Sequence, residues 1–202
     1  MIVIKSILDV EKYLDDIDAV IFDLDDTLYS EKEYVRSGYM KIAQRFEEPE
    51  LAERMWQVFL RGGKAIDETV QEDQRAEALQ IYRNQEPDIH FYPGVEDMIA
   101  RIRGKKKVGI ITDGRPEGQW AKIRALNLNA DEIIVTDELG GVEYRKPNPL
   151  AFQLMAERFA VAYNRMVYIG DNISKDFVTP ENLGMKCILF SNADGLYRKR
   201  QN

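Results

Sequence analysis

The sequence has 202 residues, of which 45% are hydrophobic and 31% are charged, and its formal net charge is −7. This length suits one α/β core with a smaller inserted unit, and the composition is that of a folded protein rather than a disordered one. The acidic balance and the shortness of the basic runs argue against nucleic-acid binding. No apolar run approaches the ~20 residues of a membrane helix, and we see no signal segment, so we expect a cytoplasmic protein without a membrane partner.

Cys187 and His90 are the single cysteine and the single histidine of the chain. A disulfide within the chain is therefore excluded, and so are a cysteine metal site, a zinc site of the usual kind and a catalytic triad. We interpret Cys187 as a core residue, because it begins an apolar run, and His90 as a structural or surface residue. The chemistry of this protein must come from other residue types.

Short apolar runs alternate with helical segments along the chain and predict a parallel sheet. The runs are rich in β-branched residues and nearly continuous in apolarity, as buried parallel strands are. They lie at 19–22, 108–111, 132–135, 166–169 and 187–190. Segments of helical period at 116–126 and 149–159 each begin with a proline, which suits a first helical turn. This alternation predicts an α/β fold with a doubly wound, Rossmann-like parallel sheet.

The stretch 30–90 breaks this rhythm, because it contains no convincing strand and shows helical stripes of apolar residues instead. We interpret it as an all-helical cap domain, inserted into a core domain made of 1–29 and 91–202. An insertion directly after the first predicted strand lies over the carboxyl edge of the sheet, where open α/β folds bind ligands. The cap is therefore placed to act as a lid. The stripes consist of Val35, Tyr39, Ile42 and Phe46, then Leu51, Met55, Val58 and Phe59.

Acidic residues crowd together at the ends of two predicted strands. Asp23, Asp25 and Asp26 follow the first, and Asp171 and Asp176 follow the strand at 166–169. At ~4 Å and an effective dielectric constant of about 20, two like charges repel by about 4 kcal/mol, so such a group needs a cation, a proton or solvent. If the sheet is parallel, both groups meet at its carboxyl edge, where their oxygens suit Mg²⁺. An acidic helix cap and a plain turn are the alternatives.

Two further strand ends carry residues that can bind an anion. Thr112, Asp113 and Gly114 lead into the helix that begins at Pro116, and Lys146 comes before a later helix. Backbone N–H groups at a helix N-terminus hold anions, a Thr hydroxyl donates to a phosphate oxygen, and a Lys ammonium neutralises developing charge. Each signal is weak alone, since Thr-Asp-Gly is a common turn and a Lys before Pro is usually exposed. Together they predict a phosphoryl-binding site.

These motifs together resemble those of the haloacid dehalogenase-like hydrolases. The pattern Asp-x-Asp-x-Thr begins at Asp23, Thr112 follows it, Lys146 precedes a proline, and Gly-Asp-x-x-x-x-Asp ends at Asp176. Their order is that of the family, and the resemblance covers about residues 19–190. The helical insertion is similar to the family's small cap.

The resemblance implies a phosphoric monoester hydrolase, a magnesium-dependent phosphatase. It makes Asp23 the nucleophile that forms an aspartyl-phosphate, and Asp25 the acid/base that protonates the leaving oxygen and later activates water. Thr112 and Lys146 would orient and neutralise the phosphoryl group. We expect a small phosphate ester as substrate, of the nucleotide or sugar phosphate class, and no obligate protein partner is evident.

The resemblance also implies the residues of the metal site. Asp23, the backbone carbonyl of Asp25 and Asp171 would hold Mg²⁺, with Asp176 as an outer-shell or water-mediated partner. Asp26 matches no catalytic role in the family's pattern.

The phosphate pocket implied by the resemblance consists of Thr112, Asp113, Gly114 and Lys146. Asp113 is a departure, because relatives that hydrolyse nucleotides often have Asn at this place. We expect its carboxylate to point away from the pocket as a helix cap.

Other functions fit parts of the same pattern. Dehalogenases of the family lack a carboxylate two places after the nucleophile and need no metal, so Asp25 argues against them. Phosphomutases keep that residue and stay open as an alternative. A receiver domain of a signalling system carries its phospho-accepting Asp after the third strand, whereas here the corresponding strand ends in Thr136 and Asp137, and the insertion has no place in that fold. A catalytically inactive relative is disfavoured, because every motif position carries a competent residue.

Overall fold

The computed structural model describes residues 1–196 and is built on a six-stranded parallel sheet. The strand order is β1-β6-β5-β2-β3-β4. The sequence predicted every strand except β1, which has three residues and only one buried side chain, too short a run to signal a strand. The strands are β1 (Ile2–Ile4), β2 (Ala19–Phe22), β3 (Lys107–Thr112), β4 (Glu132–Val135), β5 (Met166–Gly170) and β6 (Lys186–Phe190).

The strand order places β2 in the interior of the sheet, between β3 and β5. It pairs with β3 on one side and β5 on the other, and Phe22 lies level with both Ile110 and Ile169. After β2 the chain forms β3 and β4 on one side of this strand, and then β5 and β6 on its other side, so the strand order reverses at β2. In such open sheets ligands bind where the strand order reverses, at the carboxyl edge. The residues that follow β2, β3 and β5 are brought to this one edge.

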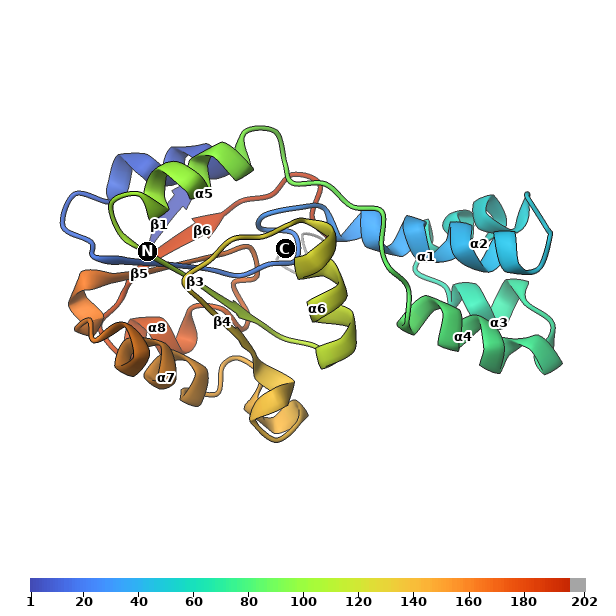
Figure 1. Cartoon of the computed structure of the whole chain (residues 1–202). Helices are drawn as coiled ribbons and strands as arrows, with labels where there is room; N and C mark the ends of the chain where they lie inside the picture. Colours follow the sequence, from blue (N-terminus) through green and yellow to red (C-terminus); the bar gives the residue numbers. More distant parts are fainter. Residues whose placement is uncertain (197–202) are drawn as a thin grey trace.

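Helices cover both faces of the sheet, as Figure 1 shows. The side chains of β2 alternate: Val20 and Phe22 pack with η1 (Ile7–Tyr13), α5 (Val95–Arg103) and α6 (Pro116–Ala125). Ala19 and Ile21 face the opposite way, toward α7 (Leu150–Phe159), and α8 (Val178–Asn182) lies next to β6. The predicted doubly wound α/β fold is confirmed. Short 3₁₀ helices complete the chain at Glu72–Gln74, Thr136–Leu139, Val142–Tyr144 and Tyr163–Arg165.

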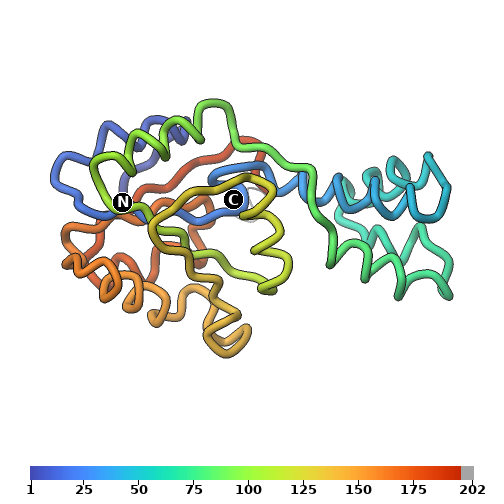
Figure 2. The backbone as a smooth tube through the Cα atoms, viewed as in Figure 1, coloured from blue at the N-terminus to red at the C-terminus, as the bar shows by residue number. Residues whose placement is uncertain are grey.

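The helices between β2 and α5 stand apart from the sheet (Figures 1 and 2). They have a hydrophobic cluster of their own, to which Ile42, Leu51 and Met55 from the predicted stripes belong. An isolated antiparallel bridge joins Tyr29 to Phe91, so the two segments that connect these helices to the sheet lie side by side. The boundaries at 30 and 90 stay a prediction. The helices are α1 (Glu31–Arg45), α2 (Leu51–Leu60), α3 (Ala65–Thr69) and α4 (Arg75–Arg83).

Two residues lie where the sequence placed them. Cys187 is 4% exposed and belongs to the core on the α7 side of the sheet. The side chain of His90 is 76% exposed. Among the described residues, no helix combines the length and apolarity that crossing a bilayer requires.

Candidate active site

Asp23 and Lys146 form a buried ion pair at the carboxyl edge of the sheet. Asp23 directly follows β2, and its N–H donates to the carbonyl of Ile169 (2.8 Å), which extends the pairing with β5 by one residue. Lys146 Nζ donates to Asp23 Oδ1 (2.7 Å) and to the Tyr168 hydroxyl (2.8 Å), and lies 3.0 Å from Asp176 Oδ1. The lysine side chain has no exposed surface and that of Asp23 is 3% exposed. The predicted nucleophile and the predicted lysine are therefore in direct contact.

Asp23, Asp171 and Asp176 form a cluster of buried carboxylates. One oxygen of each lies within 4.8 Å of the other two. Burial raises the pKa of Asp171 to about 9, and the charges of Asp23 and Asp176 add to this effect. Burial also raises the pKa of Asp23 to about 6, although Lys146 opposes the rise. The raised pKa values show that these carboxyls resist ionising together without a further cation, and this set of hard oxygen donors fits a divalent cation such as Mg²⁺.

The position of Asp176 depends on Gly170, the last residue of β5. The N–H of Asn172 donates to Asp176 Oδ2 at 3.0 Å and holds this oxygen over the strand end. A Cβ on Gly170 would lie 2.5 Å from the same oxygen. A glycine is therefore required here for Asp176 to approach the backbone so closely.

Asp25 is held by side chains from α6 and from the segment between β2 and α1. Lys122 Nζ donates to its Oδ1 at 2.7 Å, Gln119 Nε2 donates to its Oδ2 at 2.9 Å, and the Tyr29 hydroxyl donates to Oδ1 as well. Its side chain is 18% exposed. Burial would raise the pKa of Asp25, but the charge of Lys122 and the hydrogen bonds outweigh burial and lower the pKa. Asp25 therefore has a fixed orientation, and these partners favour its charged form.

Thr112, at the end of β3, is fully buried and adjoins Asp25 through Gln119. Gln119 Nε2 donates to Thr112 Oγ1 at 2.5 Å and to Asp25 at the same time. Gly114 has a φ of +142°, and a Cβ there would lie 3.1 Å from the Gln119 side chain. The glycine of the Thr-Asp-Gly segment thus leaves room for the glutamine that joins the two motifs.

Asp113 does not cap a helix, so that prediction was wrong. Helix α6 begins at Pro116, its N-cap residue is Arg115, and the Arg115 side chain makes no capping hydrogen bond. Asp113 Oδ1 accepts from the Thr136 hydroxyl (3.0 Å) and the Lys146 N–H (3.1 Å), and Oδ2 contacts Lys175 Nζ (3.1 Å). Burial would raise the pKa of Asp113, but the two lysine charges outweigh it and lower the pKa. The lysines attract the carboxylate more strongly than a helix terminus would.

Asp26, which matched no catalytic role, has structural partners. Its φ is +53°, its Oδ1 accepts from the N–H of Glu31 at the start of α1, and its Oδ2 accepts from the N–H of Leu196. The alternative reading of the acidic segment, a cap at a helix start, thus applies to Asp26.

Sequence reasoning missed several polar residues of the site. Lys122 and Gln119 lie three positions apart on α6, so they share a face, and that spacing of polar residues in a core helix was the signal available. Lys175 lies inside the last motif, but its contact with Asp113 was not predicted. Tyr168 was predicted only as part of a strand, and its hydrogen bond with Lys146 was not.

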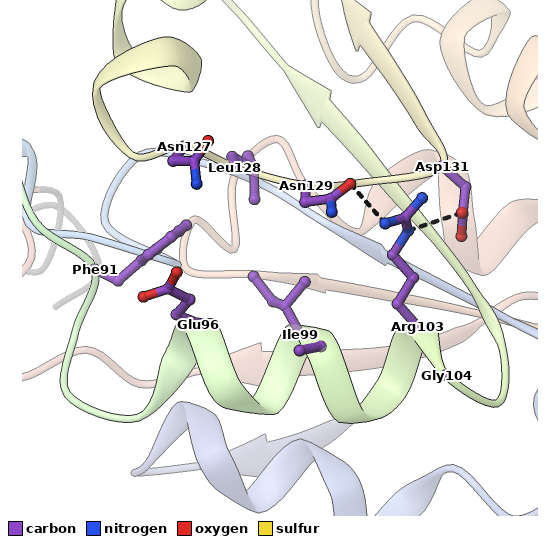
Figure 3. A pocket seen from close by; sticks show the side chains of 10 residues that line it. Phe91, Glu96, Ile99, Arg103, Gly104, Asn127, Leu128, Asn129 and Asp131 are labelled. Atoms are coloured by element: carbon purple, nitrogen blue, oxygen red, sulfur yellow. Dashed lines mark hydrogen bonds and ion pairs between the residues drawn. The ribbon is translucent and has the colours of Figure 1, made fainter.

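A surface pocket of about 470 Å³ lies elsewhere, between α5 and the segment that follows α6 (Figure 3). Phe91, Ile99 and Leu128 give it an apolar floor. Its one arginine, Arg103, already bonds Asn129 and Asp131. None of the residues that line this pocket belongs to the carboxylate cluster, so the site predicted from the motifs is a different place.

The chain is similar to proteins named glyceraldehyde 3-phosphate phosphatases. The glyceraldehyde 3-phosphate phosphatase of Pyrococcus abyssi is 33% identical over 101 residues, which are 48% of this chain and 41% of that protein. The protein of the same name from Methanothermobacter thermautotrophicus is 23% identical over 201 residues, 86% of this chain and 85% of that protein. The chain thus spans about two fifths of the first relative's length and most of the second's.

Solved structures share the fold. A haloacid dehalogenase-superfamily hydrolase from Geobacter sulfurreducens superposes with a TM-score of 0.68 at 17% identity, covering 88% of this chain and 89% of that one. A hydrolase of this type from Bacillus subtilis, bound to magnesium, gives 0.65 at 18% identity and covers 86% of each chain. A family model for haloacid dehalogenase-like hydrolases matches residues 17–184, which include every predicted site residue. The chain therefore belongs to the haloacid dehalogenase-like hydrolases.

Proposed function

We propose that this protein is a magnesium-dependent phosphatase that hydrolyses a small phosphomonoester, with Asp23 as the nucleophile. The observation that carries the proposal is the contact of Lys146 Nζ with Asp23 Oδ1 at 2.7 Å, inside a cluster of buried carboxylates. A nucleophilic carboxylate needs a fixed orientation and a neighbouring cation to accept a dianionic phosphate. Lys146 provides both here.

In the first step, a carboxylate oxygen of Asp23 attacks phosphorus, and the bond from phosphorus to the ester oxygen breaks. Asp25 must carry a proton for this step: it takes one up from solvent when the ester binds and donates it to the leaving oxygen, while Thr112 and Lys146 hold the phosphoryl oxygens. Asp113 helps to position Lys146, because its carboxylate accepts a hydrogen bond from the backbone N–H of Lys146. The products of this step are the free alcohol and an aspartyl-phosphate on Asp23.

In the second step, Asp25 takes a proton from water, whose oxygen attacks phosphorus and displaces the Asp23 carboxylate. Inorganic phosphate leaves and Asp23 returns to its starting form. Mg²⁺ would be held by Asp23, Asp171 and the backbone carbonyl of Asp25, with Asp176 as an outer-shell or water-mediated partner. The charge of the metal ion would offset that of the phosphate.

We propose a small sugar phosphate as the substrate, because the curated relatives are named glyceraldehyde 3-phosphate phosphatases. We also propose that 30–90 is a cap over the site. Its support is that α1 begins eight residues after Asp23 and that α1 to α4 pack on their own cluster. A phosphomutase of the same fold remains the second candidate, since it needs the same Asp25.

The test is phosphate release from a panel of sugar phosphates, triose phosphates included, and nucleotides. We expect turnover with Mg²⁺, none with EDTA, and a loss of about 10⁴-fold or more in Asp23→Asn. Metal-independent turnover or full activity of Asp23→Asn would overturn the proposal. Conversion between isomers that needs a bisphosphate activator, without net phosphate release, would favour the mutase.

A further inference from the structure

We propose that Lys122 is a positioning residue, which holds the Asp25 carboxylate in its working orientation and is itself held by Tyr34 of the helical insertion. This inference rests on the proposed function, because it takes Asp25 as the acid/base. Lys122 lies outside all of the motifs.

The ammonium group of Lys122 is buried and contacts three side chains. Its side chain is 7% exposed, although lysine is rarely buried without a partner. Nζ donates to Asp25 Oδ1 (2.7 Å) and to Gln119 Oε1 (2.8 Å), and lies 4.4 Å from the centre of the Tyr34 ring. An ammonium has three N–H donors, and two of them are thus used while an aromatic face covers the group. This lysine is built into the site rather than placed on the surface.

Both oxygens of Asp25 are held from one face of α6. Lys122 occupies Oδ1 and Gln119 occupies Oδ2 at 2.9 Å. A carboxylate that is gripped at both oxygens cannot rotate about its terminal bond without breaking a hydrogen bond. Removing Lys122 leaves Oδ1 with the Tyr29 hydroxyl and also takes away the hydrogen bond that anchors the Gln119 amide, so the carboxylate is held less firmly at both oxygens.

Tyr34 connects the helical insertion to the side chains that hold Asp25. Tyr34 is 6% exposed and lies on α1, whereas Lys122 lies on α6 of the sheet domain. The Tyr34 ring is packed edge-on against Tyr82 of α4, with the ring centres 5.7 Å apart. The insertion therefore contacts the sheet domain at the lysine that holds Asp25. The position of these helices and the orientation of Asp25 both depend on the contact between Tyr34 and Lys122.

The chemistry offers a readout that a merely structural lysine would not affect. An alkyl phosphate releases a strongly basic alkoxide and needs the proton of Asp25, whereas p-nitrophenyl phosphate releases a stable phenolate and needs it much less. The kcat/KM value covers the steps up to phosphoryl transfer. A misplaced Asp25 must therefore lower kcat/KM for the alkyl ester selectively, while general damage to the fold lowers both.

The experiment compares kcat/KM for both esters at saturating Mg²⁺ in wild type, Lys122→Met, Lys122→Arg and Tyr34→Leu. We expect Lys122→Met to lose about 100-fold on the alkyl phosphate and far less on p-nitrophenyl phosphate. Lys122→Arg should recover part of the loss, and Tyr34→Leu should show the same selectivity to a smaller degree. Arg124→Met, an exposed cation on the same helix, is the matched control and should behave as wild type.

Equal losses on the two esters in Lys122→Met, or no loss, would overturn the inference. If Lys122→Met does not fold, the selectivity of Lys122→Arg and Tyr34→Leu decides the question by the same criterion. The proposed function fails differently: wild type would then show no magnesium-dependent turnover of either ester, or Asp23→Asn would match wild type.

Discussion

The ammonium nitrogen of Lys146 lies 3.0 Å from Oδ1 of Asp176, and neither side chain has any exposed surface. The same nitrogen contacts Asp23 at 2.7 Å. One buried cation thus faces two buried carboxylates. A charge that is buried away from water is stabilised by its charged partners. Removing one partner of a buried pair therefore lowers the stability of the fold by about 3–5 kcal/mol.

Lys146→Met should therefore lower the free energy of unfolding by about 3–5 kcal/mol in EDTA and abolish turnover. Adding Asp176→Asn to this variant should restore part of the stability, because it removes one of the stranded charges. Urea denaturation measures both effects. Lys105→Met, at an exposed lysine, should change stability by less than about 0.5 kcal/mol. A Lys146→Met protein as stable as wild type would contradict the burial of this charge.

Gly170→Ala should weaken Mg²⁺ binding without unfolding the protein. The new Cβ would lie 2.5 Å from Asp176 Oδ2, so the carboxylate must move away from the cluster. Displacing a supporting group of a metal site typically costs about tenfold or more in affinity. Isothermal titration with Mg²⁺ measures this loss.

Gly104→Ala is the matched control for Gly170→Ala. Gly104 has a φ of −63°, and the nearest atom to its added Cβ is 3.5 Å away. We expect unchanged Mg²⁺ affinity and a stability gain of about 0.4–1 kcal/mol. The same loss of affinity in both variants would show that the Gly170 effect is not steric.

Mg²⁺ should stabilise the folded protein, because the carboxylate cluster exists only in that state. At about 100 times the Kd the gain is about 2.7 kcal/mol, visible as a higher Tm. Asp171→Asn should remove most of this gain. A Tm that does not respond to Mg²⁺ in wild type would count against a metal site in the cluster.

Asp137 and Arg145 form a bidentate pair beside Lys146, with contacts of 2.7 and 2.6 Å. The hydrogen bonds from Arg145 lower the pKa of Asp137 below its usual range. The pair thus adds stability that is complete above the unfolded pKa of ~3.9 and is lost as the pH falls through the lowered folded pKa.

Asp137→Asn should therefore cost about 1 kcal/mol near neutral pH, and the difference from wild type should shrink below about pH 4. Denaturation curves across this range measure it. A difference that stays constant as the pH falls would mean that the ion pair is not the cause.

Ile42→Ala should destabilise the helical insertion by about 2–5 kcal/mol, because Ile42 is fully buried in the cluster of α1 to α4. If 30–90 is a domain of its own, hydrogen exchange should rise in these helices while the amides of β2, β3 and β5 keep their protection. Met40→Ala, at a residue that is 59% exposed, should change little. Equal loss of protection in sheet and insertion would argue for one cooperative unit.

Much of the fold and part of the site could be predicted, because both depend on local features. Strands β2 and β5 are continuous apolar runs, and chain connectivity alone puts Asp23 and Asp171 at their carboxyl ends. β1 escaped prediction because its pairing with β6 comes from packing at the sheet edge rather than from a long apolar run. The orientation of Asp113 escaped it because the two lysines that hold its carboxylate lie 33 and 62 positions away along the chain.

The sequence by itself determined the order of the elements, the parallel sheet and the residue types at the strand ends. Periodicity and connectivity are properties of neighbouring residues, so they can be read from the chain. Only the tertiary structure decided which cation faces which carboxylate. Asp23 meets Lys146 across 123 positions, and Asp25 meets Lys122 across 97. Such ion pairs exist because packing removes water around both groups, and no local pattern records that packing.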